Sequence, residues 1–328
     1  MQLIPTLSDN YGRRFNYLRL SVTEVCNFRC NYCLPDGFCG SKNNDELSLY
    51  EIEKLVSAFA LNGTTKVRIT GGEPTLRKDL VDIVRVCNTI EGIDTIAMTS
   101  NGYKIQRDLP DLVDAGLNAL NLSVDSLDAA KFNLITGHNK LKRVLDGIEQ
   151  AIDLGVSSVK LNAVLLREFN ENEIHTFIDY VKTRPVSFRF IELMRTNDNQ
   201  AFFEKQHVSG ESICRKLEDS GWDKVAKACA AGPAQEYAHP DYEGKIGLIM
   251  PYSKDFCQSC NRLRLSSTGN LHLCLFEENH TPLRAYIESE SVPELAARIR
   301  KIVLGKNEHH FLHDGVSGST DQLAMIGG

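Results

Sequence analysis

The amino-acid sequence predicts an α/β protein: a partial (β/α)6 barrel of the TIM-barrel type, with a smaller C-terminal domain across the barrel mouth. Short β-branched segments alternate with helical patterns over roughly the first two hundred residues, which indicates βα units around a parallel sheet. Polar residues recur at the carboxyl ends of successive strands, where β/α barrels carry their active sites. This second observation favours a barrel over an open, doubly wound sheet.

Six segments have the short, β-branched character of buried parallel strands, and helical patterns separate them. The expected strands are Tyr17–Thr23, Lys66–Thr70, Thr95–Thr99, Ala119–Val124, Ser158–Leu165 and Ser187–Leu193. The expected helices are Ser48–Leu61, Asp79–Asn88, Leu109–Ala115, Leu141–Leu154 and Glu171–Thr183, followed much later by an amphipathic helix over Val292–Val303. The alternation stops after residue 194, so we expect a barrel domain over residues 1–195 and a C-terminal domain over residues 196–328.

Composition and charge argue against several classes of protein. The 328-residue chain has a formal net charge of -6 at pH 7, whereas nucleic-acid binding requires a basic surface. No run approaches the roughly 18 apolar residues of a membrane span, and no apolar signal region follows Met1. We therefore expect a cytoplasmic protein that binds neither nucleic acid nor membrane, as a monomer or a homodimer. Its cysteines are then reduced thiols and metal ligands, with Cys87, Cys214 and Cys229 expected to be structural.

Three cysteines form a C-x3-C-x2-C group directly after the first strand. Cys26, Cys30 and Cys33 can converge on one metal centre, but no fourth ligand is near except Cys39, beyond a Pro-Asp-Gly turn. A structural zinc site usually has four protein ligands, whereas a 4Fe–4S cluster on three cysteines keeps one iron open for a ligand. The spacing therefore favours an iron–sulfur cluster, and zinc or a redox thiol pair are the alternatives.

A glycine pair follows the second strand in Gly71-Gly72-Glu73-Pro74. Residues without a Cβ atom let the backbone approach a ligand closely. Glu73 can pair with an ammonium group. By itself this motif is also a plausible tight turn.

Basic residues alternate with apolar residues in several strands. Both faces of a parallel barrel strand are buried, so charges there need partners. The residues concerned are Arg19, Lys66, Arg68, Lys160 and Arg189. Some of them could meet solvent at a strand start or pair with acids such as Glu192. A polyphosphate ligand inside the barrel explains the whole set together.

A second group of three cysteines, C-x2-C-x13-C, lies in the C-terminal part at Cys257, Cys260 and Cys274. A zinc ribbon completed by His272 is one interpretation, and a second 4Fe–4S cluster with an open iron is the one we favour. Arg262 and Arg264 alternate with leucines, so both guanidinium groups project from one face beside the cluster, as bidentate phosphate binding would need. Further along, the histidines of residues 308–313 are expected to lie in an exposed polar turn.

Together these motifs and the terminal Ile326-Gly327-Gly328 resemble the GTP 3′,8-cyclase family, radical S-adenosylmethionine enzymes that begin molybdenum cofactor biosynthesis. The resemblance runs from about Gly12 to Gly328. It implies a partial barrel with a C-terminal iron–sulfur domain, two 4Fe–4S clusters, and S-adenosylmethionine as cofactor. It also implies that a 5′-deoxyadenosyl radical takes the 3′ hydrogen of GTP, after which C3′ attacks C8 of guanine.

By the same resemblance, residues can be given roles. Cys26, Cys30, Cys33, Arg262 and Arg264 would be catalytic; Tyr32, Gly72, Glu73, Ser123 and Met194 would bind S-adenosylmethionine; Arg19, Lys66, Arg68, Thr99, Lys160, Arg189, Arg262 and Arg264 would bind GTP. Lys66 and Arg189 enter this set through the strand alternation alone. The two cysteine groups would hold the clusters. The tail Gly327-Gly328 would reach into the active site.

The family also implies partners. They are GTP, an electron donor of the flavodoxin or ferredoxin type, and the cyclic pyranopterin monophosphate synthase that acts next in the pathway. Two other classes remain open. One is a radical S-adenosylmethionine enzyme that modifies a peptide and carries an auxiliary cluster. The other is a zinc-binding scaffold without enzymatic activity.

Overall fold

The computed structural model describes residues 6–40, 45–227, 231–277 and 279–318. A single curved sheet runs through them in the order β12-β11-β10-β1-β2-β3-β4-β5-β6-β9-β8-β7. The barrel strands are β1 (Tyr17–Ser21), β2 (Lys66–Thr70), β3 (Thr95–Ser100), β4 (Ala119–Ser123), β5 (Ser158–Leu165) and β6 (Ser187–Glu192). All neighbouring pairs among these six strands are parallel, which confirms the six predicted βα strands and the partial barrel.

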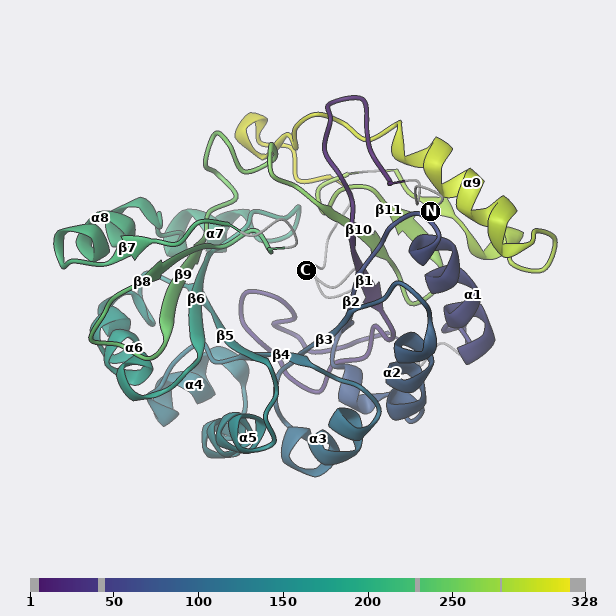
Figure 1. Ribbon diagram of the computed structural model, residues 1–328. Coiled ribbons are helices and arrows are strands. Elements are labelled where there is room, and N and C mark those ends of the chain that lie inside the picture. The colour runs from purple at the N-terminus through teal and green to yellow at the C-terminus, as the bar shows by residue number, and fades with distance from the viewer. Residues whose placement is uncertain (1–5, 41–44, 228–230, 278, 319–328) are drawn as a thin grey trace.

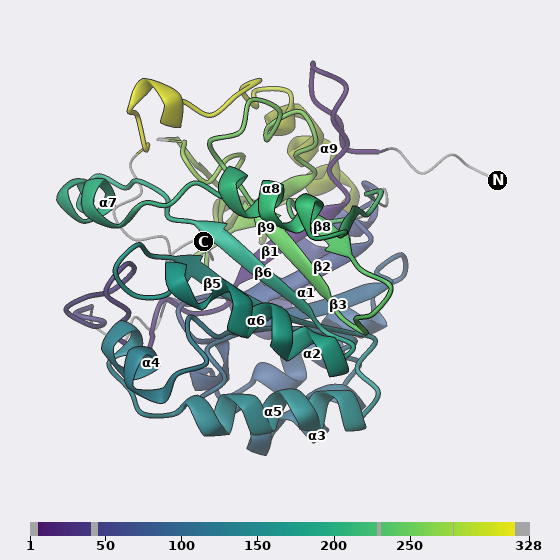
Figure 2. The same cartoon turned by 90° about the vertical axis from the view of Figure 1, so that its left-hand side faces the viewer.

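Helices cover the outer face of this sheet, as Figures 1 and 2 show. They are α1 (Leu49–Ala60), α2 (Leu80–Thr89), α3 (Ile105–Asp114), α4 (Ala129–Thr136), α5 (Leu141–Asp153) and α6 (Ile174–Tyr180). α1 begins with a capping box in which Ser48 and Glu51 bond each other's backbone amides. α4 was not predicted. Its start at the cap Asp128 and its end at Gly137, with φ 74°, are local signals that the long spacing between strands obscured.

The C-terminal part adds strands to both edges of the barrel sheet. β9 (Lys245–Ile249) pairs in parallel with β6, and β10 (Arg262–Leu265) pairs in parallel with β1. β7 (Asp223–Lys224) and β8 (Gln235–Ala238) continue antiparallel beyond β9, and β11 (Asn270–His272) and β12 (Thr281–Pro282) beyond β10. The parallel run of the described residues therefore has eight strands instead of six, and β9 and β10 join the C-terminal part to the barrel through backbone pairing.

Three further helices belong to the C-terminal part: α7 (Gln200–Gln206), α8 (Glu211–Asp219) and α9 (Val292–Val303). The bounds of α9 are those predicted. Figure 1 shows α9 alongside α1. Asn62, just past α1, donates a hydrogen bond of 2.9 Å to the carbonyl of Ala296 in α9. The first and last α-helices of the described chain thus pack together on the outside of the sheet.

The core lies between the sheet and its outer helices. Leu18 and Leu20 of β1 and Val67 and Ile69 of β2 are fully buried in it, whereas the basic residues between them face the barrel interior. Cys87 of α2 lies in the same core, as expected of a structural cysteine. The alternation seen in the sequence therefore separates an apolar outer face from a polar inner one.

No helix among the described residues combines the length and the apolar character that crossing a bilayer requires.

Candidate active site

The inner face of the barrel forms a cavity with about 1130 Å³ of empty space, its open mouth included. All seven cations predicted from the strand pattern line it: Arg19, Lys66, Arg68, Lys160, Arg189, Arg262 and Arg264. Strand register explains how they meet. Arg264 of β10, Arg19 of β1 and Arg68 of β2 are direct neighbours across three adjacent strands. Residues of five strands are thereby brought to one space.

Few protein anions balance these cations. Within the described residues, Lys160 has one carboxylate partner, Glu236, at 3.6 Å. No ion pair is found there for Arg68, Arg189, Arg262 or Arg264. Arg189 instead donates two hydrogen bonds, of 3.0 and 2.8 Å, to the side-chain oxygen of Asn162. A cluster of this kind is costly to bury unless an anion enters it.

In the described part of the chain, two of these arginines have a buried hydrogen-bond donor that lacks an acceptor. The Nε atoms of Arg262 and Arg264 are buried and have no hydrogen-bond partner in the described part of the chain. Burial, followed by the charges of Arg19 and Arg262, lowers the pKa of Arg264 to about 9. Burial and the charge of Arg189 likewise lower the pKa of Lys160 to about 8. These groups are therefore prepared for a polyanionic ligand.

The second cysteine group lines the same cavity. Cys260 lies two residues before β10, and the antiparallel return through β11 brings Cys274 back beside the start of β10. The backbone amide of His310 contacts the sulfur of Cys257 at 3.5 Å. Burial raises the pKa of Cys260, but the positive charges of Arg262 and Lys306 outweigh it and lower this pKa to about 7. A thiolate, the form that binds iron, is thus favoured here.

Nothing in the described residues supports a single-ion zinc site. No group of three or more His, Cys, Asp or Glu side chains among them is arranged to hold one metal ion. His272, which would complete a zinc ribbon, is not among the residues that line the cavity with Cys257, Cys260 and Cys274. A 4Fe–4S cluster binds each cysteine at a different iron, so three thiols need not converge on one point. Both cysteine groups fit such a cluster better than zinc.

The first cysteine group lies in the loop between β1 and α1. Two backbone hydrogen bonds hold this loop against the end of α4: the amide of Arg29 donates to the carbonyl of Thr136 (3.1 Å), and the amide of Asn31 to that of Ile135 (2.9 Å). Burial, then the charges of Asp125, Cys33 and Cys26, raise the pKa of Cys30 well above its usual value. The three thiols are therefore close enough to repel one another as thiolates. Binding of iron would release their protons.

The glycine pair holds this loop in place. Gly72 donates to the carbonyl of Thr23 and Glu73 to the carbonyl of Val25, both at 2.8 Å. A Cβ atom on Gly72 would lie 2.4 Å from the carbonyl oxygen of Val25. The close approach expected of Gly71 and Gly72 is therefore made to the backbone just before Cys26.

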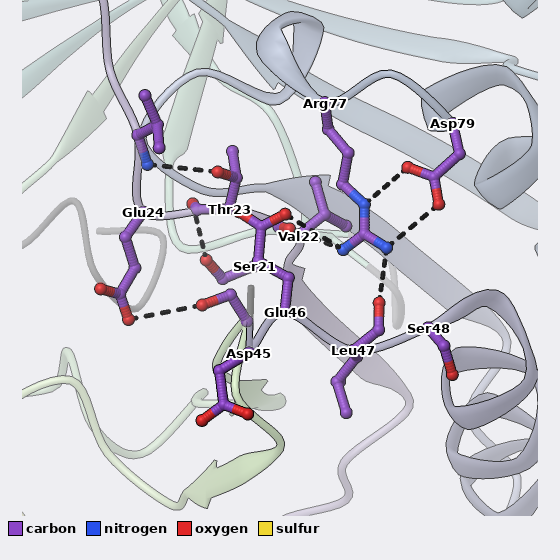
Figure 3. Close-up of polar contacts among 12 residues, drawn as sticks. Ser21, Val22, Thr23, Glu24, Asp45, Glu46, Leu47, Ser48, Arg77 and Asp79 are labelled. Carbon is purple, nitrogen blue, oxygen red and sulfur yellow. Dashed lines mark hydrogen bonds and ion pairs between the residues drawn. The ribbon is translucent and has the colours of Figure 1, made fainter. Parts of the chain in front are cut away.

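Arg77 adds a second attachment at the same point. Its guanidinium group donates to the carbonyls of Val22 and Leu47 and pairs with Asp79, as Figure 3 shows. Its side chain is only 6 % exposed. These contacts of Arg77 connect the end of β1 with the segment before α1 and with the start of α2, next to the cysteine loop.

Glu73, expected to pair with an ammonium group, is held by donors from two loops. Its carboxylate is fully buried and accepts hydrogen bonds from the amide (3.0 Å) and hydroxyl (2.6 Å) of Thr75. It also accepts from the hydroxyl of Ser100 (2.8 Å) and the amide of Asn101 (2.6 Å). Oε1 accepts three of these bonds and Oε2 accepts one, so Oε2 can still accept another. The structure thus gives Glu73 the task of joining the loops after β2 and β3.

The remaining predicted residues fall in two places. Thr99 and Met194 line the cation cavity, whereas Tyr32 and Cys33 line a separate cavity. The hydroxyl of Tyr32 donates to Asp125 at 2.9 Å, and burial raises the pKa of this carboxyl to about 6. Ser123 ends β4. The residues predicted for GTP are thus gathered in one space, and those predicted for S-adenosylmethionine are not.

Several cavity residues escaped the sequence analysis. Tyr17, Asn162, Lys306 and His310 all line the cavity. His310 is 7 % exposed, so the expectation of a wholly exposed polar turn was wrong at this residue. Tyr17 could have been found because it shares the inward face of β1 with Arg19, whereas Lys306 and His310 follow α9 in a loop without periodicity. Cys229, Gly327 and Gly328 lie outside the described residues.

Comparisons with known proteins bear on both halves of the chain. Residues 20–181 match the Radical SAM superfamily and residues 186–312 match Molybdenum Cofactor Synthesis C. A GTP 3′,8-cyclase of Pectobacterium atrosepticum is 51 % identical over 329 residues, covering 99 % of this chain and 100 % of that protein. One of Haemophilus ducreyi is 51 % identical and covers 98 % and 95 %. Streptococcus suis SuiB bound to S-adenosylmethionine has a similar fold, with a TM-score of 0.64 at 13 % identity, over 95 % of this chain and 76 % of that one.

Proposed function

This chain belongs to the GTP 3′,8-cyclase family of radical S-adenosylmethionine enzymes, and from that membership we propose how its residues carry out the reaction. The reaction converts GTP into (8S)-3′,8-cyclo-7,8-dihydroguanosine 5′-triphosphate, the first step of molybdenum cofactor biosynthesis. The observation that carries the proposal is a cavity whose lining includes the seven predicted cations and the three cysteines of the second group.

Cys26, Cys30 and Cys33 would hold the 4Fe–4S cluster of the family. With S-adenosylmethionine this cluster supplies the 5′-deoxyadenosyl radical that removes the 3′ hydrogen of GTP. Tyr32, Gly72, Ser123 and Met194 would contact S-adenosylmethionine, since they follow or flank the strand ends near this loop. Cys257, Cys260 and Cys274 would hold a second 4Fe–4S cluster at the purine end of GTP.

The chain itself binds and orients the substrate. The triphosphate would be bound by basic residues that line one buried space, and among the residues that the structure describes the Nε atoms of Arg262 and Arg264 have no hydrogen-bond partner. These basic residues are Arg19, Lys66, Arg68, Lys160, Arg189, Arg262 and Arg264. Thr99 lies 3.2 Å from Arg68 and would help to fix it. A bound triphosphate places the ribose between the two cysteine groups. The buried lining would strengthen the electrostatic contacts with the bound triphosphate.

We also propose the cellular setting. Reduced thiols require a reducing compartment, which favours the cytoplasm. Reductive cleavage of S-adenosylmethionine consumes an electron, which a flavodoxin or ferredoxin would deliver. A cyclic pyranopterin monophosphate synthase would consume the product. The Gly327-Gly328 tail would approach bound substrate.

Anaerobic protein reconstituted with iron and sulfide tests the activity directly. GTP, S-adenosylmethionine and dithionite should give 5′-deoxyadenosine together with the cyclised nucleotide, and ATP in place of GTP should give no cyclised product. The control variant Cys26→Ala/Cys30→Ala/Cys33→Ala should form neither product. Formation of 5′-deoxyadenosine without nucleotide product would favour a peptide-modifying enzyme, and zinc in place of iron a scaffold.

A further inference from the structure

A tyrosine lies inside the cation cluster. Tyr17, the first residue of β1, is 4 % exposed and lines the same cavity as the seven basic residues. It lies two residues before Arg19, so both side chains point inward. In the sheet register its neighbours are Arg262 on one side and Lys66 on the other. The phenol therefore lies between the barrel strands and the C-terminal strand β10.

The contacts of Tyr17 are with cations. Its phenol oxygen accepts a hydrogen bond from Nε of Arg68. The ammonium group of Lys66 lies 5.0 Å from the centre of its ring. On its other side Arg68 is fixed by the carbonyl of Met98 and the hydroxyl of Thr99, both at 3.2 Å. Tyr17 thus completes the set of contacts that orients Arg68 toward the cavity.

The groups that act on the phenol come from several elements. They are Arg19 on β1, Lys66 and Arg68 on β2, and Arg189 on β6, with Arg262 beside it on β10. Glu236 of β8, which is not among the residues that line the cavity, pairs with Lys160 and also acts on Arg189. Burial raises the pKa of Tyr17, but the charges of Arg68, Arg19 and Lys66 outweigh it and lower the pKa to about 7. The phenol is thus able to ionise near neutral pH.

We propose that Tyr17 is a positioning residue that serves as the built-in counter-ion of the polyphosphate subsite. While the site is empty, its ionised oxygen holds Arg68 and balances the neighbouring cations. When a polyphosphate enters with its own negative charge, the phenolate takes up a proton from solvent and an O–H bond forms. No covalent bond to the ligand is made or broken. The inference deepens the proposed function, since the ligand would be the triphosphate of GTP, but it concerns any polyphosphate.

Proton uptake on binding tests this role. Inorganic triphosphate is titrated into the reconstituted holoprotein by calorimetry at pH 8, in two buffers of different ionisation enthalpy. About nine tenths of a group with a pKa of about 7 is ionised at pH 8. The wild-type protein should therefore take up close to one proton more than Tyr17→Phe. Protons exchanged by triphosphate itself are common to both proteins and cancel in the difference.

The pH dependence of affinity gives a second readout. Between pH 7 and 9 the affinity of the wild-type protein should fall about tenfold more per pH unit than that of Tyr17→Phe, because binding requires the protonated phenol. Tyr180→Phe is the matched control. Arg184 lies over the ring of Tyr180, which is not among the residues that line the cavity. This variant should behave as the wild type, and iron content and melting temperature verify that all three proteins are intact.

Two results would overturn the proposal: equal proton uptake by wild type and Tyr17→Phe, or no uptake by the wild type at pH 8 after the protons released by triphosphate itself are subtracted. The second result needs no variant and so does not depend on the folding of Tyr17→Phe. Failure of the proposed function can be distinguished from failure of this inference. A protein that binds triphosphate with Tyr17-dependent uptake but does not cyclise GTP retains this inference and loses the proposed activity.

Discussion

Arg262 and Arg264 project from β10 with buried Nε atoms that lack a partner in the described chain. We predict that Arg→Ala at either position weakens GTP binding by about 1.5–3 kcal/mol, the range for hydrogen bonds to charged groups. This corresponds to roughly 10- to 150-fold in Kd, measured by equilibrium binding to the anaerobic protein.

A surface arginine is the appropriate control for that experiment. Arg85 of α2 pairs with Asp82 while its side chain is 58 % exposed, so Arg85→Ala should leave GTP affinity unchanged. Iron content should be retained in all three variants. If Arg262→Ala or Arg264→Ala lost iron but kept full GTP affinity, these arginines would be structural.

Single residues also show where sequence patterns stop being informative. Alternation placed five cations on one face because period two is a property of any strand. Strand alternation could not predict the hydrogen-bond donors around Glu73, which belong to Thr75, Ser100 and Asn101. These residues follow or end two different strands, so no single local pattern contains them. In the sequence, Tyr17 looks like an aromatic residue of the apolar core. Its place in the site follows from its contacts with Arg68 and Lys66, which the structure shows.

At the scale of elements, the turn after β2 and the cysteine loop after β1 form one unit. A Cβ atom on Gly72 would lie 2.4 Å from Val25 O and 2.6 Å from Glu24 O, both backbone atoms. We predict that Gly72→Ala displaces the loop that begins at Cys26, lowers iron binding by the first cysteine group, and abolishes cleavage of S-adenosylmethionine. Iron analysis and 5′-deoxyadenosine formation measure these effects.

Gly305 provides the matched glycine. It lies just after α9, where the nearest atom to a new Cβ is 3.3 Å away, so Gly305→Ala should keep both iron and cleavage. A Gly72→Ala protein with wild-type iron and wild-type cleavage would show that the two loops are independent.

The six barrel strands and α9 could be predicted because their apolar patterns are local. The extension of the parallel sheet by β9 and β10 could not. Arg262–Leu265 is four residues long, and its parallel partner β1 lies at the other end of the chain, so no local pattern carries the pairing. The short helices α7 and α8 were missed for a related reason, since they lie where the βα spacing no longer applies.

At the scale of the whole molecule, the two cysteine groups lie at opposite ends of one strand pair. The first group follows the carboxyl end of β1, and Cys257 and Cys260 precede the amino end of the parallel neighbour β10. A five-residue strand spans about 17 Å. The cations of β1, β2 and β10 therefore lie between two metal-binding regions that do not share ligands.

From this separation we predict two independently removable clusters. Cys26→Ala/Cys30→Ala/Cys33→Ala should lose about half of the iron and all cleavage of S-adenosylmethionine, while the other cluster stays. Cys257→Ala/Cys260→Ala/Cys274→Ala should also lose about half of the iron and retain some cleavage, but form no cyclised GTP. The expected loss of half of the iron assumes that the protein holds two clusters with the same number of iron atoms.

Iron and sulfide analysis, together with product analysis, distinguishes the two variants. Cys214→Ala serves as the control, because this cysteine contacts Met250 outside both groups, and it should retain full iron content. Iron unchanged by either triple substitution would contradict the assignment of the clusters.

The pairing of β1 with β10 also has a consequence for how the protein is made. Tyr17 and its partner Arg262 are separated by about 245 residues, and a ribosome adds roughly 5–20 residues per second, so some 12–50 s pass between them. During that interval β1 has no neighbour on one side, and the cavity lacks the wall that carries Arg262 and Arg264. A growing chain therefore cannot hold a polyphosphate until translation is nearly complete.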